Sequence, residues 1–352
     1  MRSFSPAHIR YLIERRLFGA AEIETVADER IVVCEAEPFD IAPSVYLPHH
    51  LDFVRRLHPE TLQENENLRV RGGRGSHDPT IAYRIKGVRF RDSGLYKGKW
   101  ARYFPPIKPQ GNDPARVVGG GSYALASSYS GIKYFGHWVR DDTATCLMAE
   151  TFAQPFCVRT PRWPHQPRYQ QFFDLPWPVI DRADFDELYV FSDYAQNSHK
   201  VARYREIRRR LRRNAPPGSP SRRVYLHRGA TGAVKRLMSN ENEVLQALSK
   251  NGFVIVDVSR DSADDIVAAL LDAETLVSIE GSHASPGVHT LAEGGGYLAI
   301  VPPAVFNNVA KDWTSALGMT YGFVVGEERG KAFHVNVRDL LTAVDALEAA
   351  RR

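Results

Sequence analysis

The sequence contains little cysteine and no long apolar segment. Its three cysteines, Cys34, Cys146 and Cys157, have neither metal-knuckle nor redox-pair spacing. An odd number of separated thiols is typical of a reducing compartment, so we expect buried thiols rather than a disulfide framework. No run of about 18 apolar residues occurs, and residues 1–16 carry basic side chains without a signal-peptide core. These absences predict a cytoplasmic protein.

Recognisable nucleotide and metal fingerprints are also missing. The glycine triplets at 119–121 and 294–296 match neither a dinucleotide nor a triphosphate loop, so they are interpreted as turns. His283 and His289 stand six residues apart, which is a poor spacing for two ligands on one helix face. The sequence therefore predicts no metal site and no bound cofactor.

Length and charge favour two domains and an anionic partner. The chain has 352 residues, more than one hydrophobic core usually supports. Its formal net charge of +5 and pI of about 9.0 favour a phosphate, an acidic glycan, a nucleic acid or an anionic membrane face. Charge alone does not choose among these partners.

A proline-rich segment divides the chain. Residues 214–222 include Pro216, Pro217, Gly218 and Pro220, which disfavour both helix and strand. We therefore expect an N-terminal α/β domain over 1–213, a linker over 214–222, a second domain over 223–330 and a helix within 331–352 that could pack back on the first domain. The arginine-rich segment 200–213 predicts a helix with an exposed basic face, or alternatively a surface that docks on anionic lipid.

Strands and helices alternate in the second half. Apolar runs at 224–227, 253–258, 276–279 and 297–301 predict buried strands. Asn240 with Glu243 and Ser262 with Asp265 have the spacing of helix-capping boxes. This alternation predicts a parallel, Rossmann-like sheet. The first half is less regular, with expected strands at 30–35, 81–91, 124–128, 156–158 and 189–191 and helices at 134–150 and, near the C-terminus, 339–351.

Candidate binding residues follow the predicted strands. Ligands of open parallel sheets bind outside the carboxyl ends of the strands, where Arg228 and Gly281-Ser282 occur. A glycine lets backbone approach a phosphate, a following helix start adds partial positive charge, and Arg228 with Arg236 could complete a diphosphate clamp. A plain tight turn is the alternative at Gly281. Glu293 could accept from ribose hydroxyls or be an ordinary helix-end carboxylate.

A second group of candidates lies in the first half. Helical spacing places His137 and Asp141 on one face, so that one could act as a base while the other orients it. Asp142 is a third candidate, and the alternatives are a surface acidic pair and a core histidine. Asp184-Phe185-Asp186 has the Asp-x-Asp form of a metal-diphosphate site, but it precedes its strand instead of following it.

These segments together resemble glycosyltransferase family 61. The succession Tyr225-Leu226-His227-Arg228, Arg236 with Asn240-Glu241, and Val277 to His283 is similar to the carboxyl-terminal domain of that family. Residues 134–141, Tyr-Phe-Gly-His-Trp-Val-Arg-Asp, are similar to its aromatic-His-Trp segment. The chain has Glu280-Gly281-Ser282 where many members carry His-Gly-Ala.

The resemblance implies a GT-B architecture, with two Rossmann-like domains facing across a cleft, and an inverting, metal-independent glycosyltransferase of the hexosyl or pentosyl class. A nucleotide-sugar would be its substrate, with Arg228, Arg236, Asn240, Glu280, Gly281, Ser282, His283 and Glu293 around the donor and Asp141 or His137 as catalytic residues. The acceptor would be a glycan in polysaccharide biosynthesis, either free or lipid-linked at the inner membrane face. The alternatives are a non-enzymatic nucleic-acid-binding protein and an inactive relative that only binds glycan.

Overall fold

The computed structural model describes residues 5–107, 115–217, 221–229 and 236–351. The chain folds into two compact units, residues 1–37 with 77–203 and residues 38–76 with 204–352. The division falls inside α8 (Ser198–Asn214), and the second unit takes in a segment from the first half of the sequence. Part of the expected linker, 218–220, lies outside the described residues.

The second unit contains a parallel sheet of five strands. They are β11 (Arg223–His227), β12 (Val254–Asp257), β13 (Thr275–Ile279), β14 (Gly296–Val301) and β15 (Thr320–Val325). Their order is β12-β11-β13-β14-β15, and every neighbouring pair is parallel. This is the doubly wound order 2-1-3-4-5, in which the direction of winding changes between the first and third strands. The parallel sheet predicted from the sequence is therefore confirmed.

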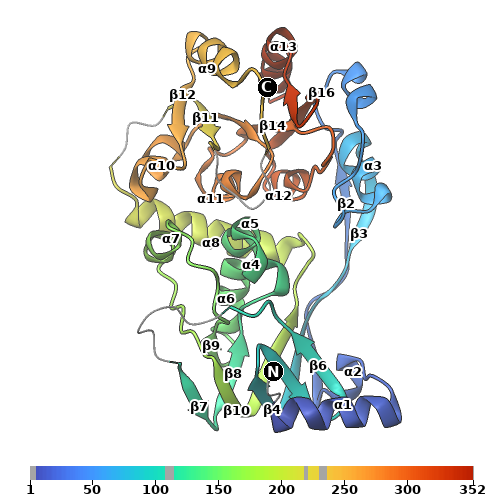
Figure 1. The fold of residues 1–352 in the computed structure, drawn as a ribbon. Helices are drawn as coiled ribbons and strands as arrows, with labels where there is room; N and C mark the ends of the chain where they lie inside the picture. The colour runs from blue at the N-terminus through green and yellow to red at the C-terminus, as the bar shows by residue number, and fades with distance from the viewer. Residues whose placement is uncertain (1–4, 108–114, 218–220, 230–235, 352) are drawn as a thin grey trace. The chain divides into compact units, whose positions relative to one another are not determined.

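Helices cover both faces of this sheet (Figure 1). On one face, α9 (Glu241–Lys250) and α13 (Val337–Ala350) bury Val244, Leu248 and Leu347 against strand residues such as Val277 and Ile300. On the other lie α10 (Ala263–Leu270), α11 (Gly287–Thr290) and α12 (Ala310–Ala316), with the ring of Trp313 stacked on Tyr297 at 6.0 Å. The C-terminal helix therefore packs on the sheet of its own unit.

Residues 38–76 belong to this unit through long-range contacts. The segment contains β2 (Glu37–Ile41) paired with β3 (Gly73–His77), the 3-10 helix η1 (Pro48–Phe53) and α3 (Gln63–Arg71). Val45 pairs with Gly322 of β15, and Arg69 donates to both carboxylate oxygens of Asp312 at 2.8 and 2.6 Å. A short hairpin of β16 (Glu327–Arg329) and β17 (Ala332–His334) follows β15.

The first unit has a mixed sheet. Its long strands β4 (Thr80–Arg91) and β10 (Arg182–Ser192) pair antiparallel, and the sheet order is β6-β5-β4-β10-β8-β9, with β1 on β4 and β7 on β10. Asp92 and Ser93 both have positive φ, 51° and 59°, which suits a tight hairpin turn into β5 and makes β4 and β5 antiparallel. The expected second Rossmann-like sheet is therefore replaced here by a mixed one. The remaining strands are β1 (Glu29–Cys34), β5 (Gly94–Lys97), β6 (Trp100–Tyr103), β7 (Val117–Gly119), β8 (Ser122–Leu125) and β9 (Gln154–Phe156).

The predicted helix 134–150 forms, but with a distorted middle. α5 (Phe135–His137) leads into a π-helical turn, η2 (Trp138–Asp142), and then into α6 (Thr143–Ala149). Single π turns inside α-helices are often found at functional sites. The other helices of the unit are α1 (Pro6–Phe18), α2 (Ile23–Val26), α4 (Tyr129–Lys133) and α7 (Gln166–Phe173).

The expected solvated arginine face of α8 forms only in part, because Arg205, Arg209 and Arg213 are exposed while other basic side chains of the helix are buried. Arg203 is 7% exposed and binds both carboxylate oxygens of Asp193 at 2.6 and 2.7 Å. Arg208 is 3% exposed and donates to the backbone oxygens of Val288 and Leu291. Because these cations are neutralised or hydrogen-bonded inside the chain, they do not contribute to a basic docking surface. Among the described residues, no helix has the length and apolar character needed to cross a membrane.

Candidate functional site

The fold brings the candidates after β11 and β13 together. These strands are neighbours at the switch point of the parallel sheet, so the loops that leave their carboxyl ends are adjacent. A side-chain carbon built on Gly281 would lie 3.2 Å from Nη1 of Arg236, 3.2 Å from Nδ1 of His283 and 3.4 Å from Nη1 of Arg228. Two guanidinium groups and an imidazole therefore surround the Gly281 backbone. We call Arg228, Arg236, Gly281 and His283 the Gly281 cluster.

Gly281 has a backbone conformation that other residues rarely adopt. Its φ of 157° and ψ of 171° fall in a region that is almost exclusive to glycine. A larger residue would both strain this turn and push against the two arginines. Glycine at position 281 therefore allows the two guanidinium groups to lie close to the backbone.

The Gly281 cluster is electrostatically positive. Arg228 is 7% exposed, and burial together with the charge of Arg236 lowers its pKa to about 10. Glu280 pairs with Arg236 through both its carboxylate and its backbone oxygen, so this carboxylate offsets part of the charge. An anion bound here would be stabilised, because the partly buried guanidinium groups would donate charge-assisted hydrogen bonds to it.

His283 is the neutral member of the cluster. Burial, followed by the charges of Arg228 and Arg236, lowers its pKa to about 3. The imidazole therefore stays uncharged at neutral pH and can act as a hydrogen-bonding group without adding a charge. Ser282 begins only a one-turn 3-10 helix, η3 (Ser282–Ala284), and α11 follows separately. The helix start expected after Gly281 is therefore a single short turn, which contributes little of the expected partial positive charge.

Two other donor candidates have different partners. Asn240 does not cap α9 through its side chain but binds the backbone of Val335 with both amide atoms, at 2.8 and 3.0 Å. Glu293 precedes β14, which places it at the amino end of the parallel strands, and its 78% exposed side chain pairs with Arg208 at 3.0 Å. The structure therefore brings neither residue into the Gly281 cluster.

A polar chain beside β11 was not predicted from the sequence. His227, the last residue of β11, lies 3.1 Å from a carboxylate oxygen of Glu241 and 3.3 Å from one of Asp257. Asp257 also accepts from the backbone and hydroxyl of Ser259, at 2.9 and 2.6 Å. The signal that could have found this group is the position of Asp257 at the carboxyl end of β12, next to β11.

In the first unit, the π turn places His137 against Asp141. His137 Nδ1 lies 2.8 Å from Oδ2 of Asp141, while Arg140 and Lys200 bind the same carboxylate at 2.7 and 3.0 Å. Burial alone would raise the pKa of Asp141, but the charges of Arg140 and Lys200 and the bond from His137 hold it well below its usual value. Asp141 is consequently a fixed anion and a weak base.

His137 is the more exposed member of this pair. Nδ1 lies 2.8 Å from Oδ2 of Asp141 and 2.9 Å from Nη2 of Arg140. In the tautomer in which Nδ1 donates to the carboxylate, Nε2 carries the lone pair, and the side chain is 32% exposed. Asp142 is different again, because it is 1% exposed and accepts from the backbone and hydroxyl of Ser128. Burial raises the pKa of Asp142 well above its ordinary value, against the effect of those bonds. Asp142 therefore holds the start of α4 in place.

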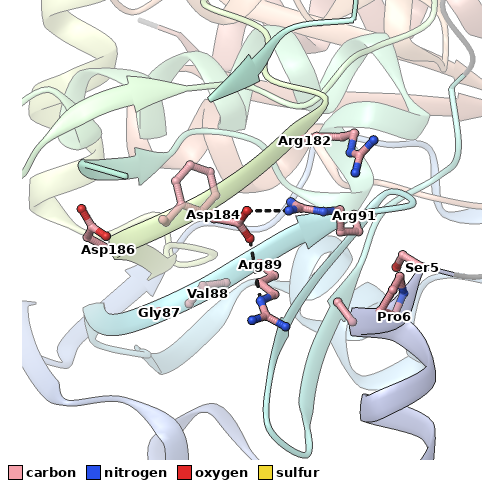
Figure 2. Close-up of a pocket in the computed structure, with 11 residues that line it drawn as sticks. Ser5, Pro6, Gly87, Val88, Arg89, Arg91, Arg182, Asp184 and Asp186 are labelled. Carbon is pink, nitrogen blue, oxygen red and sulfur yellow. Dashed lines mark hydrogen bonds and ion pairs between the residues drawn. The ribbon is translucent and has the colours of Figure 1, made fainter. Parts of the chain in front are cut away.

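The Asp184-Phe185-Asp186 motif lines a cavity of about 500 Å³ in the first unit. Figure 2 shows Asp184 between the guanidinium groups of Arg91 and Arg89, at 2.6 and 3.8 Å, with Asp186 apart from them. Asp186 instead accepts from the backbone nitrogen of Gly121 at 2.7 Å. Because the two carboxylates do not converge, this motif lacks the geometry of a metal-diphosphate site.

Part of the chain matches a known protein family. Residues 135–289, somewhat less than half of the chain, match the family described as Glycosyltransferase 61. No curated protein gives a significant match. The matched range contains His137, Asp141, Arg228 and Gly281 but ends before Glu293. Over this range the chain is similar to the glycosyltransferase 61 family, and that similarity supports a glycosyltransferase.

Proposed function

We propose that the protein is an inverting glycosyltransferase that takes a sugar from a nucleoside-diphosphate donor without needing a metal ion at the diphosphate. The Gly281 cluster is the observation that carries this proposal, because it gathers two arginines and a glycine turn at the switch point of a parallel sheet. Negative charge develops on the leaving diphosphate during transfer, and fixed positive groups stabilise it. The match to the glycosyltransferase 61 family supports the same activity.

In this proposal the second unit binds the donor and the first unit supplies the acceptor base. His137 Nε2 takes the proton from the acceptor hydroxyl, the hydroxyl oxygen bonds to the anomeric carbon, and the bond from that carbon to the diphosphate oxygen breaks. Asp141 orients the imidazole and stabilises its protonated form. Attack opposite the leaving group inverts the anomeric centre.

The acceptor is proposed to be a glycan or polysaccharide. We do not extend the proposal to anionic lipid or nucleic acid, because Arg203 and Arg208 of α8 are engaged inside the chain. Arg209 and Arg210 pair with Glu206, and Arg212 pairs with Asp272. The basic helix thus retains less free charge than its composition indicates.

Donor binding is tested by calorimetric titration of nucleoside diphosphates in the presence of a chelator. Removing one charged hydrogen bond costs about 1.5–3 kcal/mol, so Arg228→Ala should bind about ten- to a hundredfold more weakly. Arg260→Ala is the matched control, since Arg260 follows β12 at the same sheet edge with an 84% exposed side chain. Arg228→Lys is measured as the conservative variant at this position, so that a loss of affinity caused by misfolding of Arg228→Ala can be recognised. Equal affinity of Arg228→Ala and wild type would remove Arg228 from the site.

The base is tested by the rate of sugar transfer. His137→Ala should lower kcat by about 10²–10⁴-fold, the usual contribution of a positioned base. Donor affinity should stay unchanged, because the Gly281 cluster is made by other residues. Asp141→Asn should lower kcat as well, since His137 loses the carboxylate that orients its ring. Full transfer activity in His137→Ala would assign the base elsewhere.

A further inference from the structure

Two histidines and an aspartate meet in the second unit, apart from the Gly281 cluster. His49 and His50 belong to η1, and Asp339 lies in the first turn of α13. Nε2 of His49 is 3.0 Å and Nε2 of His50 is 3.4 Å from Oδ2 of Asp339. One ligand atom from each of the three side chains lies within 4.8 Å of the others. We refer to these residues as the His49–His50–Asp339 group.

The His50 ring is held in place by the end of β15. His50 is 2% exposed, and its Nδ1 lies 2.8 Å from the backbone nitrogen and 3.0 Å from the backbone oxygen of Val325. The Val325 N–H donates to Nδ1, which leaves the ring proton on Nε2, so binding of a cation by Nε2 requires the proton to move to Nδ1, where it can donate to the Val325 oxygen. A backbone carbonyl on one ring nitrogen, with the other directed at the ion, is the usual setting of a metal-bound histidine.

Hydrogen bonding alone does not satisfy His50. Its Nε2 is buried and has no hydrogen-bond partner within the described part of the chain. The 3.4 Å separation from Asp339 exceeds the 2.7–3.2 Å range of good N–H···O bonds. A buried imidazole nitrogen that faces a carboxylate at this distance is consistent with both groups binding a third partner between them.

The spacing suits a small cation. Zinc binds histidine nitrogens and carboxylate oxygens at about 2.0–2.2 Å, which puts neighbouring ligand atoms of a tetrahedral site about 3.4 Å apart. The separations of the two imidazole nitrogens from the Asp339 oxygen, 3.0 and 3.4 Å, are close to that edge length. His49 can close the remaining distance by turning its ring, since its side chain is 51% exposed.

The geometry points to a zinc-binding site formed by His49, His50 and Asp339. Two imidazoles and one carboxylate favour Zn²⁺ over Mg²⁺ or Ca²⁺, which prefer oxygen ligands. The ion fastens segment 38–76 to α13, two parts of the unit that are far apart in the sequence. Because Val325 ends β15, two strands from β13, the site lies about 10 Å along the sheet edge from the Gly281 turn. Its role is structural and separate from the diphosphate.

The test is zinc binding by the full-length protein after chelator treatment. Zn²⁺ is titrated by calorimetry and by competition with a chromophoric chelator, and we expect one saturable ion per chain and a raised Tm. His49→Gln and Asp339→Asn should each weaken zinc binding at least about tenfold, a loss that even outer-shell partners of a metal can produce. His58→Gln is the control, because His58 belongs to the same segment and its ring accepts from the backbone of Glu60.

Cobalt absorption gives a second readout that does not depend on stability. Co²⁺ placed in the site should show visible bands of a low-coordinate N/O environment, and these should change in His49→Gln while His58→Gln keeps them. Absence of saturable zinc binding by the wild type would overturn the proposal. So would unchanged affinity in both His49→Gln and Asp339→Asn, or equal loss in His58→Gln. Nucleoside-diphosphate affinity is measured in parallel, and its failure would refute the Gly281 assignment without affecting the zinc site.

Discussion

Acidification should destabilise the protein through His283. The pKa of His283 is lowered from 6.5 to about 3 by burial and by the charges of Arg228 and Arg236. Between these values the unfolded chain binds a proton that the folded chain does not, so stability falls as the pH decreases. The stability that depends on the neutral His283 imidazole is fully present above about pH 6.5 and is lost progressively toward pH 3.

The size of this effect follows from the pKa difference. A difference of 3.5 pKa units corresponds to about 5 kcal/mol below pH 3, and about 2 kcal/mol of that is lost by pH 5. Urea unfolding at pH 7 and at pH 5 measures the unfolding free energy lost between the two pH values. This loss should be about 2 kcal/mol smaller in His283→Gln than in the wild type. His50 and His199 have pKa values shifted in the same direction, so the difference between variant and wild type is the quantity to compare.

A control separates His283 from general acid sensitivity. His58→Gln, in the same unit, should lose as much stability between pH 7 and pH 5 as the wild type does. If His283→Gln showed the wild-type pH dependence, the imidazole would not be held neutral by burial and the two arginines. The electrostatic description of the Gly281 cluster would then be wrong.

Two further substitutions test other parts of the description. Gly281→Ala should cost about 1–3 kcal/mol in unfolding free energy, because φ of 157° strains an alanine, and calorimetry should show weaker nucleoside-diphosphate binding. Wild-type values for both quantities would contradict the close approach inferred at Gly281. Asp193→Asn leaves Arg203 without its buried carboxylate and should lower the unfolding free energy by about 3–5 kcal/mol in urea denaturation. A loss below about 1 kcal/mol would show that this ion pair behaves like an exposed one.

The second half of the chain was predictable because its signals are local. The Ser262–Asp265 capping box forms as expected, and the apolar runs become β11 to β14. Arg228 and Gly281 lie close together, as predicted, because the carboxyl ends of parallel strands share one edge of the sheet. Glu293 lies at the opposite edge of the sheet from the one predicted. Two short helical turns follow β13, and the chain has returned to the amino ends of the strands by residue 293.

The first half was less predictable because its structure depends on pairing between distant residues. Segment 38–76 joins the second unit through Val45 on β15 and Arg69 on Asp312, and no local pattern reports such contacts. The burial of Arg203 was likewise hidden, because its partner Asp193 precedes a helix whose composition alone indicates a solvated face. The grouping of His49 and His50 with Asp339 could not be predicted, because Asp339 is about 290 positions away in the sequence.

The Gly281 cluster is costly to the folded protein, and this cost is itself informative. Two guanidinium groups are held near one backbone turn, and the lowered pKa of Arg228 shows that its positive charge is disfavoured there. A protein can retain a charge imbalance where an anionic ligand relieves it, because binding to the native state alone adds to stability. The imbalance lies at the carboxyl edge of a parallel sheet, which is where a diphosphate is most readily accommodated.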